Sequence, residues 1–426
     1  MQSTWDCDGL RQDQTLQALM DILIVGQGGR EHALAWKIRQ SKHANKIYVI
    51  PGNDGMRDVA QTIDIAMGDY PSIISFAIDN KIDLTIIGSE KPLCDGLVDM
   101  MEEKGLKVFG PTKKAAEIEG SKAFAKSMME KYNIPTAFYH KVKTFEEAKQ
   151  VLIHSKYPIV IKADGLAAGK GVVIAKDFHE AFESSVLFLE TNPCVVIEEY
   201  LEGIEFSLIA FANGETLYPF EIAQDYKRAF DNHQGPNTGG MGSYSPVPSI
   251  SKEAIDEAIE KVMKPMLYGL EKEKRLFKGF LYGGLMLTKD GVKVIEFNAR
   301  LGDPEAEVLL PRLKDDILEV IESILEHKPK TLLFDQRACV GVVMASKGYP
   351  LHYEKGFPIE IGQEHSTIFH MGTKYIDNKY VTFGGRVLIA VSLGKDHDEA
   401  RQKAYQTIDN ISCDNLFYRK DIGLIK

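Results

Sequence analysis

A glycine-rich, basic segment occupies residues 162–171, where the sequence reads Lys-Ala-Asp-Gly-Leu-Ala-Ala-Gly-Lys-Gly. It is not a Walker loop, because that motif needs Ser or Thr after its lysine, and here Gly171 follows Lys170. Strand-like residues flank the segment, so we expect a hairpin flap over a phosphate, with Lys162 and Lys170 supplying charge. A hairpin without a ligand is the alternative. The glycines that would approach the phosphate are Gly165, Gly169 and Gly171.

Three polar residues alternate with apolar ones further along the chain. On a strand, Glu296, Asn298 and Arg300 share one face, whereas Ile295 and Phe297 point to the core. A carboxylate beside an amide oxygen offers hard ligands that suit Mg²⁺ or Mn²⁺. Arg300 would suit a phosphate or a carboxylate. A half-exposed strand without a metal is the alternative.

An acidic connector follows the apolar run at 195–197. Backbone groups exposed after a strand can pair with the edge of an adenine ring, and a carboxylate can accept hydrogen bonds from both ribose hydroxyls. A solvated acidic surface is the alternative. The candidate nucleotide contacts here are Glu198, Glu199, Tyr200, Leu201 and Glu205.

Residues 224–242 form a long segment rich in glycine, asparagine and basic residues. Long loops without regular structure in compact domains are usually functional or disordered. The interleaved Asp225, Lys227, Arg228 and Asp231 favour a binding loop. The turn at 382–386 could add Arg386 over an anionic substrate, or it could simply lead into a strand.

The segment 26–31, Gly-Gln-Gly-Gly-Arg-Glu, is similar to a dinucleotide-binding fingerprint. That pattern requires glycine at its sixth position and an acidic residue about 20 positions later. This chain has Glu31 and Asn53 at those places, so nicotinamide binding is disfavoured. Backbone N–H groups at a helix N-terminus can still hold a phosphate, and Asn53 can bond a sugar. A plain tight turn is the alternative.

Alternating strands and helices are predicted to position these residues in the first part of the chain. An apolar run at 21–25 leads through the glycine turn into helical spacing. Further apolar runs lie at 46–50, 83–88 and 106–110. This alternation predicts a parallel, doubly wound sheet, as in a Rossmann-like domain, over roughly residues 21–121.

The middle of the chain, residues 122–333, is predicted to hold closely spaced strands in antiparallel pairs, with a flap lobe at about 140–213. A last α/β unit is predicted at 334–426. The whole is therefore α/β, and α+β in parts. The predicted strands are 157–162, 172–175, 195–200, 205–211, 216–221, 282–288, 292–297, 338–345 and 385–391. The predicted helices are 252–268 and 396–408.

Composition excludes several classes of protein. The 426 residues carry a formal net charge of −10, which argues against a nucleic-acid partner or an anionic membrane. Five scattered cysteines suit a reducing cytoplasm, and no apolar run reaches the roughly 18 residues of a membrane span. Residues 1–20 are polar and mixed, so we expect a disordered leader or tag. We expect a monomer with small-molecule substrates.

Together, the motifs resemble those of the phosphoribosylamine–glycine ligase family, within the ATP-grasp superfamily. The resemblance covers residue 21 to the end in family order. The segments that carry it are 26–34, 51–53, 163–172, 235–242, 296–300, 302–305, 345–350 and 417–419.

The resemblance implies a Rossmann-like domain, a pair of ATP-grasp lobes and a small C-terminal domain, with ATP between the lobes. It implies ATP-dependent ligation of glycine to 5-phosphoribosylamine through glycyl phosphate, giving glycinamide ribonucleotide, in purine synthesis. Lys122 and Lys162 would contact ATP, and Glu296 and Asn298 would hold the metal. Arg300, Lys227, Arg228 and Asp225 are the expected catalytic residues. The expected substrate contacts are Gly28, Gly29, Arg30, Asn53, Asn237, Thr238, Gly239, Gly240, Asp303 and Arg386.

Three alternatives remain open. Another ATP-grasp carboxylate ligase would share the flap and the metal strand but should lack the 224–242 segment in this form. A nucleotide-binding regulatory protein needs no metal clamp, and a dehydrogenase is disfavoured by Glu31 and Asn53. The strand at 282–288 offers no carboxylate, so the metal ligand set is incomplete from sequence.

Overall fold

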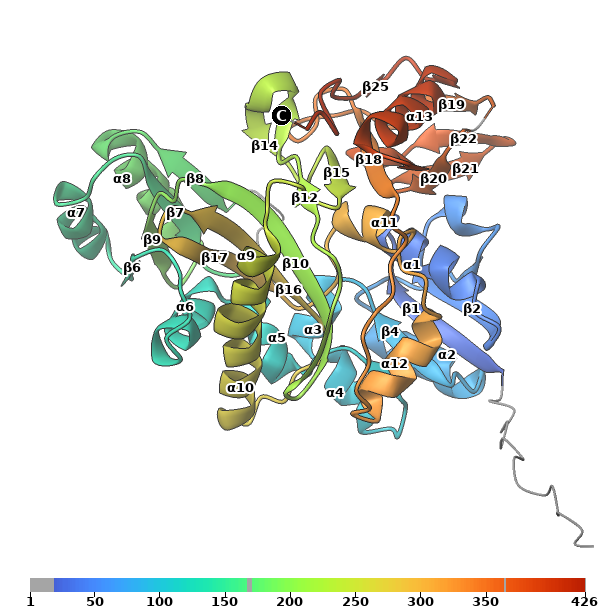
Figure 1. The fold of residues 1–426 in the computed structure, drawn as a ribbon, viewed down its shortest axis with the longest axis horizontal. Coiled ribbons are helices and arrows are strands. Elements are labelled where there is room, and N and C mark those ends of the chain that lie inside the picture. Colours follow the sequence, from blue (N-terminus) through green and yellow to red (C-terminus); the bar gives the residue numbers. More distant parts are fainter. Residues whose placement is uncertain (1–18, 167–170, 364, 426) are drawn as a thin grey trace, which may run out of the picture.

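The computed structural model describes residues 19–166, 171–363 and 365–425, which form an assembly of mixed α/β domains (Figure 1). The predicted fold class is confirmed. Nearly all of the expected leader at 1–20 lies outside the described residues, but Met20 belongs to the first strand. The domain limits 21–121, 122–333 and 334–426 stay predictions.

A five-stranded parallel sheet forms the N-terminal part, in the order β3-β2-β1-β4-β5. The apolar run from Ile22 to Val25 is fully buried at its centre, as expected for a strand covered on both faces. The parallel prediction is therefore confirmed. The strands are β1 (Met20–Gly26), β2 (Ala44–Pro51), β3 (Gln61–Thr62), β4 (Leu84–Ile87) and β5 (Val108–Phe109). The helices are α1 (Gly29–Arg39), η1 (Asp54–Met56), α2 (Tyr70–Asp79), α3 (Glu90–Asp95), α4 (Leu97–Glu102) and α5 (Lys113–Gly120).

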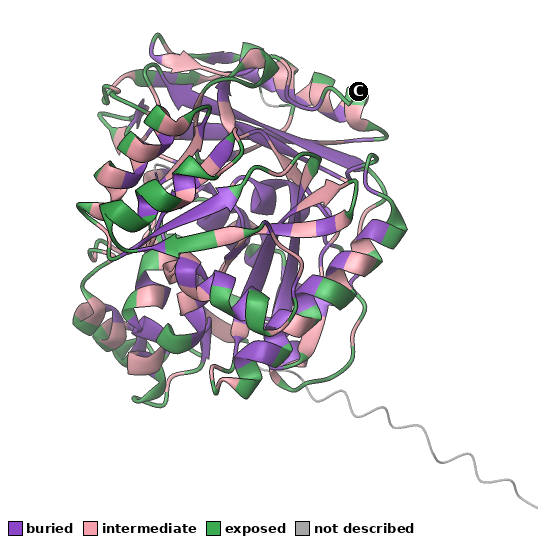
Figure 2. Cartoon of the chain, turned by 90° about the vertical axis from the view of Figure 1, so that its left-hand side faces the viewer, coloured by how far each residue is buried: buried purple, intermediate pink, exposed green. Residues whose placement is uncertain are grey.

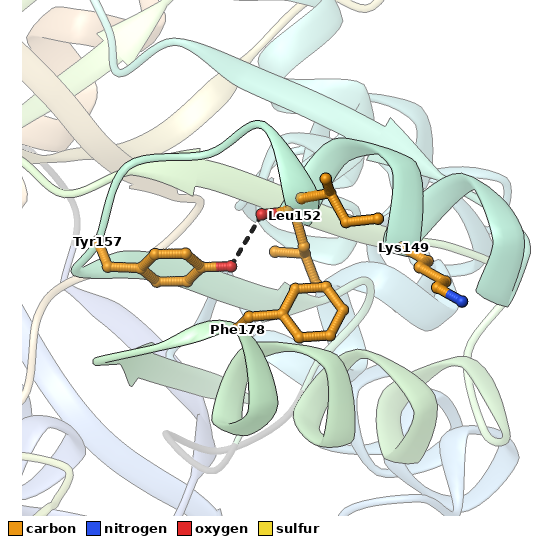
Figure 3. Close-up of a pocket in the computed structure, with 5 residues that line it drawn as sticks. Lys149, Leu152, Tyr157 and Phe178 are labelled. Carbon is orange, nitrogen blue, oxygen red and sulfur yellow. Dashed lines mark hydrogen bonds between the residues drawn. The ribbon is translucent and has the colours of Figure 1, made fainter.

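The flap lobe projects from the rest of the molecule and has a small core of its own (Figure 1). Its antiparallel sheet has the order β6-β9-β7-β8. A shallow apolar hollow lies on this lobe, where the Tyr157 hydroxyl donates to the Leu152 carbonyl (Figure 3). The strands are β6 (Tyr139–Val142), β7 (Ile159–Ala163), β8 (Val172–Ala175) and β9 (Val195–Glu199). The helices are α7 (Phe145–Ile153) and α8 (Phe178–Leu189), and α6 (Lys122–Lys131) precedes the lobe and packs against α5, α10 and β17 as well as β9.

A second antiparallel sheet, in the order β11-β10-β16-β17, lies between the flap lobe and the N-terminal sheet (Figure 1). A β-bulge interrupts the β16–β17 pairing between Gly284 and Leu285. The strands are β10 (Ile204–Asn213), β11 (Thr216–Pro219), β16 (Lys278–Thr288) and β17 (Gly291–Asn298). The helices are α9 (Lys252–Ala258), the π-helical turn η3 (Ile259–Met263), α10 (Lys264–Lys272), α11 (Glu305–Leu309) and α12 (Ile317–Leu325).

The C-terminal sheet begins in the middle of the chain. Its order is β12-β15-β18-β23-β20, with β25 also paired to β18. The strands are β12 (Gln224–Asp225), β15 (Gly242–Ser245), β18 (Ala338–Ser346), β20 (Thr367–His370), β23 (Arg386–Gly394) and β25 (Leu416–Phe417). The smaller sheet contains β19 (Pro358–Ile361), β21 (Thr373–Ile376), β22 (Lys379–Thr382) and β24 (Ile411–Ser412), and α13 (His397–Asp409) packs on β18 and β23.

Residues 224–242 are not the loop without regular structure that the sequence predicted. They contain β12, the short pair β13 (Arg228–Phe230) and β14 (Gln234–Asn237), the turn η2 (Asp231–His233) and the start of β15. Glycine and asparagine are depleted in strands generally, so the composition of this segment predicted a loop instead of the strands.

Two large cores join the N-terminal, central and C-terminal sheets. One cluster contains Ile24 of β1, Phe211 of β10, Ile321 of α12 and Val343 of β18. Figure 2 shows the buried residues on the strands and on the inner sides of the helices.

Among the described residues, no helix is both long and apolar enough to cross a membrane.

Candidate functional site

A cavity of about 920 Å³ lies between the flap lobe and the central sheet. The 224–242 segment and two acidic residues of the N-terminal part complete its wall. Most of the residues singled out in the sequence line it. These are Lys122, Lys162, Gly165, Gly171, Glu198, Glu199, Tyr200, Leu201, Glu205, Asp225, Lys227, Arg228, Asn237, Thr238, Gly239, Glu296, Asn298, Arg300 and Asp303.

Two lysines share one buried carboxylate on the flap-lobe side of the cavity. Lys162 of β7 donates to Glu198 Oε2 at 3.1 Å and to the Ile295 carbonyl at 2.9 Å. Lys126 of α6 lies 3.0 Å from the same Glu198 oxygen and donates to Thr136. Burial and the charge of Lys162 lower the pKa of Lys126 to about 8, against the opposing pull of Glu198. Lys126 was missed, although it stands four residues after Lys122 on the same face of α6.

The flap is anchored to the start of α6. Lys122 donates to the Gly165 carbonyl at 2.8 Å, and burial lowers the pKa of Lys122 despite the nearby Glu296. Asp164 accepts hydrogen bonds from the Ser121 hydroxyl and the Ala123 amide. The predicted contacts Gly169 and Lys170 lie outside the described residues.

The end of β9 and the start of β10 form the side on which the sequence predicted adenine and ribose. Tyr200 is 41% exposed, which leaves the backbone after β9 accessible. Apolar side chains border this part of the cavity, among them Val160, Ile174 and Met286. Glu205 is not free, because Lys227 lies 3.2 Å from its Oε2.

Strand β17 carries Glu296 and Asn298 into the cavity, as predicted. Burial would raise the pKa of Glu296, but Lys227, Lys162, Lys122 and Arg300 outweigh it and lower that pKa. Glu296 is therefore an anion, and these four cationic side chains stabilise its charge. The prediction that Ile295 points to the core is wrong, because Ile295 is half-buried and lines the cavity. The β-bulge, which pairs Gly284 with Glu296 but Leu285 with Val294, breaks the strict alternation at this point.

A second group of acidic residues in the cavity consists of Glu305 of α11 and Asp225 of β12. Ser207 and Tyr282 both donate to Glu305 Oε1 at 2.9 Å, and all three side chains are buried. Burial raises the pKa of Asp225 to about 7, and Lys227 only partly offsets this. Burial would lower the pKa of Lys227, but Glu205, Asp225 and Glu296 raise it. Lys227 is therefore a permanent cation among carboxylates. Tyr282 and Glu305 were missed, because nothing in the local pattern shows which strands face each other.

Arg300 connects the cavity to the N-terminal part. Its NH2 lies 2.9 Å from Glu119 Oε1, and its Nε lies 3.6 Å from Glu90 Oε2. Glu90 also lies 3.5 Å from NH2 of Arg30. Burial and Arg30 are the largest influences on Glu90, and the two arginines lower its pKa to about 2. The sequence motifs did not indicate Glu90 or Glu119, because the arginines that they contact are distant in sequence.

The glycines at the start of α1 lie beside carboxylates and outside the lining of the cavity. Glu31 accepts the Gly28 amide at 2.7 Å and folds back over Gly26, where an added methyl group would lie 2.5 Å from it. This carboxylate occupies the space that a dinucleotide pyrophosphate needs at the turn. The dehydrogenase alternative is therefore disfavoured by this geometry as well as by the sequence.

Arg386 and Asn53 join loops near this helix and also lie outside the cavity lining. Arg386 NH1 contacts Asp303 Oδ1 at 2.9 Å and the Gly239 carbonyl at 2.6 Å, and it lies 3.4 Å from the Gly240 carbonyl. The Asn53 amide donates to the carbonyls of Gln27 and His370, and its oxygen accepts the Gly55 amide. The structure thus places Asn53 as a tie between the N-terminal and C-terminal parts.

Residues 419–423, which we call the C-terminal clasp, hold the 224–242 segment in place. The fully buried Arg419 donates twice to Asp421, at 2.7 and 2.6 Å, and once to the Arg228 carbonyl at 2.9 Å. Asp421 in turn accepts the Asn232 amide at 2.9 Å. The clasp therefore fixes the backbone that carries Asp225, Lys227 and Arg228.

Replacing Arg419 by methionine should lower the free energy of unfolding by about 3 kcal/mol, at the low end for breaking a buried ion pair because Asp421 is partly exposed. Ligand binding in the cavity should also weaken, because the 224–242 segment loses its support. Arg337→Met is the matched control, since Arg337 pairs with Asp335 at the same spacing but is 55% exposed. Its cost should stay below about 1 kcal/mol. Denaturant unfolding of both variants checks this, and equal losses would contradict the role of the clasp.

Comparisons with known proteins agree with this geometry. Family models for phosphoribosylglycinamide synthetase match in order: the N domain over residues 20–119, the ATP-grasp (A) domain over 120–306 and the C domain over 339–425. The chain is 51% identical over 413 residues to phosphoribosylamine–glycine ligase of Halalkalibacterium halodurans, covering 95% of this chain and 96% of that one. It is 48% identical to the enzyme of the same name from Caldanaerobacter subterraneus, covering 95% and 99%.

Solved structures give the same picture. The crystal structure of phosphoribosylamine–glycine ligase from Thermotoga maritima matches with a TM-score of 0.83 and 34% identity, covering 94% of this chain and 99% of that one. A biotin carboxylase domain from Hydrogenobacter thermophilus matches with a TM-score of 0.72 at 15% identity, covering 94% and 92%. The second likeness shows a shared fold alone.

Proposed function

Because this chain belongs to the phosphoribosylamine–glycine ligase family, we propose that the cavity between the flap lobe and the central sheet is its active site. The chain is an ATP-dependent carbon–nitrogen ligase of purine biosynthesis, which joins glycine to phosphoribosylamine. It uses ATP with a divalent metal. The observation that carries the assignment of the site is the group of four cations around Glu296 in one cavity.

We propose that Lys122, Lys162 and the flap bind the phosphates of ATP. The support is that both lysines reach the cavity from elements that also hold the base of the flap. Ammonium groups and closely approaching backbone amides are the usual partners of phosphate. The accessible backbone at Tyr200 and Leu201 would then serve adenine, and Glu205, freed from Lys227, would serve ribose.

Glu296 and Asn298 would hold the metal, which we propose to be Mg²⁺ or Mn²⁺. Their oxygens are the hard donors that these ions prefer, and both side chains line the cavity. Among the described residues, no side-chain or backbone donor is hydrogen-bonded to the Glu296 carboxylate, which leaves it available. When bound, such an ion neutralises phosphate charge during transfer.

The proposed chemistry has two steps. A carboxylate oxygen of glycine attacks the γ-phosphorus of ATP, the bond to the bridging oxygen breaks, and ADP leaves with that electron pair. The amine nitrogen of phosphoribosylamine then attacks the carbonyl carbon of glycyl phosphate, and phosphate leaves as the amide forms. Neither step needs a covalent protein nucleophile, so the residues act by positioning and charge neutralisation. Arg300, Lys227 and Arg228 would carry that neutralisation, and Asp225 would receive the amine proton.

The remaining predicted contacts form the substrate side in this proposal. Asn237, Thr238, Gly239 and Asp303 line the cavity, whereas Arg386, Gly240 and the turn from Gly28 to Arg30 support them from behind. The active unit in this proposal is a monomer. The free state of the four described cysteines supports the cytoplasm as the location.

Phosphate release measures this function directly. We expect release from ATP and a divalent metal only when glycine and freshly generated phosphoribosylamine are both present. Omission of either substrate should reduce the steady rate to background. Release that needs neither substrate, or another carboxylate in place of glycine, would point to a different ATP-grasp ligase.

A further inference from the structure

Glu307 is a buried carboxyl group that has no hydrogen-bond partner among the described residues. Its side chain is 0% exposed, and neither carboxylate oxygen has a hydrogen-bond partner. It lies behind the turn that starts α1, since a methyl group added at Gly29 would lie 2.5 Å from Glu307 Oε1. A buried, ionised carboxylate without a donor is strongly disfavoured. A buried, neutral carboxylic acid is much less costly.

The charges around Glu307 come from three elements. Arg30 faces it from α1, Asp303 from the turn before α11, and Arg386 from β23. Strands β15 and β18 also pack against α11 but carry no charged residue. Asp303 Oδ1 is itself without a hydrogen-bond partner, although Arg386 lies 2.9 Å away. Glu31, which accepts the Gly28 amide, adds a further acid beside Arg30.

Arg30 and Arg386 face three carboxyl groups in this buried cluster of Arg30, Glu31, Asp303, Glu307 and Arg386, and Arg30 also lies 3.5 Å from Glu90. The carboxyl groups therefore outnumber the guanidinium groups, which favours one neutral carboxyl group. Glu307 is that group, because Glu31 and Asp303 each have an arginine within 3 Å. Burial, and next the charge of Asp303, raise the pKa of Glu307 well above its usual value.

We propose that Glu307 is a positioning residue that supports the substrate side of the active site only while its carboxyl group carries a proton. Ionisation would place a second anion beside Asp303, in competition for Arg386. Arg386 holds the Gly239 carbonyl at 2.6 Å and the Asp303 carbonyl at 3.0 Å, and both of these residues line the cavity. Loss of the proton would therefore loosen the wall next to the proposed phosphoribosylamine position. Glu307 itself does not line the cavity and need not touch the substrate.

The first test measures thermal unfolding as a function of pH for the wild type, for Glu307→Gln and for Glu360→Gln. The unfolded chain loses the Glu307 proton near pH 4.3, and the folded chain keeps it to higher pH. The folded state therefore binds more protons in this window, and the wild-type stability falls as pH rises. The amide variant lacks this loss. Its unfolding midpoint should exceed that of the wild type by a margin that widens with pH.

The exposed Glu360 of β19 is the matched control, and its variant should follow the wild type at every pH. A margin between wild type and Glu307→Gln that is independent of pH would overturn the proposal. Should the amide variant fail to fold, Glu307→Met provides the same comparison with a neutral side chain of similar length. Infrared spectra should also show a carbonyl band of a protonated carboxylic acid in the wild type, and this band should be absent from the neutral variant.

The second test rests on the proposed function and measures the Michaelis constant for phosphoribosylamine over the same pH range. We expect the constant to rise with pH in the wild type by more than in Glu307→Gln, so that the ratio of the two grows with pH. Parallel profiles would overturn the positioning role. If neither protein shows ligation, the proposed function has failed, and the unfolding series still decides whether Glu307 holds a proton.

Discussion

Replacing Glu296 by glutamine should reduce the rate of ligation by about 10²–10³-fold, the size of effect seen when one preorganised electrostatic contact is removed from an active site. The amide keeps the shape of the side chain but removes the charge that Lys227, Lys162 and Lys122 surround. It also removes one of the two proposed metal ligands on β17. The variant should therefore need at least about 10-fold more metal for half-maximal activity.

Phosphate release at increasing metal concentration measures both effects. Asp290→Asn is the matched control, because it makes the same change on the exposed turn of the same hairpin. The control should keep the rate and metal dependence of the wild type. A Glu296→Gln enzyme with an unchanged metal dependence would remove Glu296 from the proposed metal site.

Arg300→Met should have the second-largest effect, and it should reduce both activity and stability. The arginine lies 2.9 Å from the buried Glu119, and it also faces Glu90. Removing one partner of a buried pair costs about 3–5 kcal/mol, because the other charge stays buried. The rate of ligation should fall by about 10²-fold or more, since Arg300 is proposed to neutralise charge during transfer.

The control for Arg300 is Arg275, whose acidic partner Glu117 lies on the same helix, α5, as Glu119. Arg275 pairs with Glu117 at 2.6 Å, but Glu117 is 42% exposed, so Arg275→Met should cost no more than about 1 kcal/mol. Arg300→Lys tests geometry, because an ammonium cannot span Glu119, Glu90 and the Leu301 carbonyl as a guanidinium does. Denaturant unfolding and phosphate release on all three variants decide the point. Similar losses for Arg300→Met and Arg275→Met would contradict the argument.

The sequence predicted those parts of the molecule whose signal is local. The apolar run at 22–25 followed by a glycine turn predicted a parallel strand and helix, because burial on both faces leaves a continuous apolar pattern. The alternation around Glu296 and Asn298 predicted a strand that presents them to one side. Both predictions needed only a window of about ten residues, and the fold of both segments is confirmed.

The missed residues depend on contacts between distant segments. Glu90, Glu119 and Lys126 stand in no motif of the sequence, and only the packing shows that they line the cavity. Ile295 was misplaced because the β-bulge interrupts the alternation. The strands within 224–242 were missed because they pair partly with strands about 100 residues later, such as β15 with β18.

The C-terminal clasp also has a consequence for the order in which the enzyme matures during translation. Asn232 and Arg228 emerge from the ribosome 189 and 191 residues before the Asp421 and Arg419 that hold them. At about 5–20 residues per second, this separation corresponds to roughly 10–40 s. During that interval the nascent chain can already fold its N-terminal sheet and flap lobe, but it lacks the support for Lys227 and Arg228. The enzyme should therefore become active only late in its synthesis, once residues 419–423 of the clasp have been made and have bound the 224–242 segment.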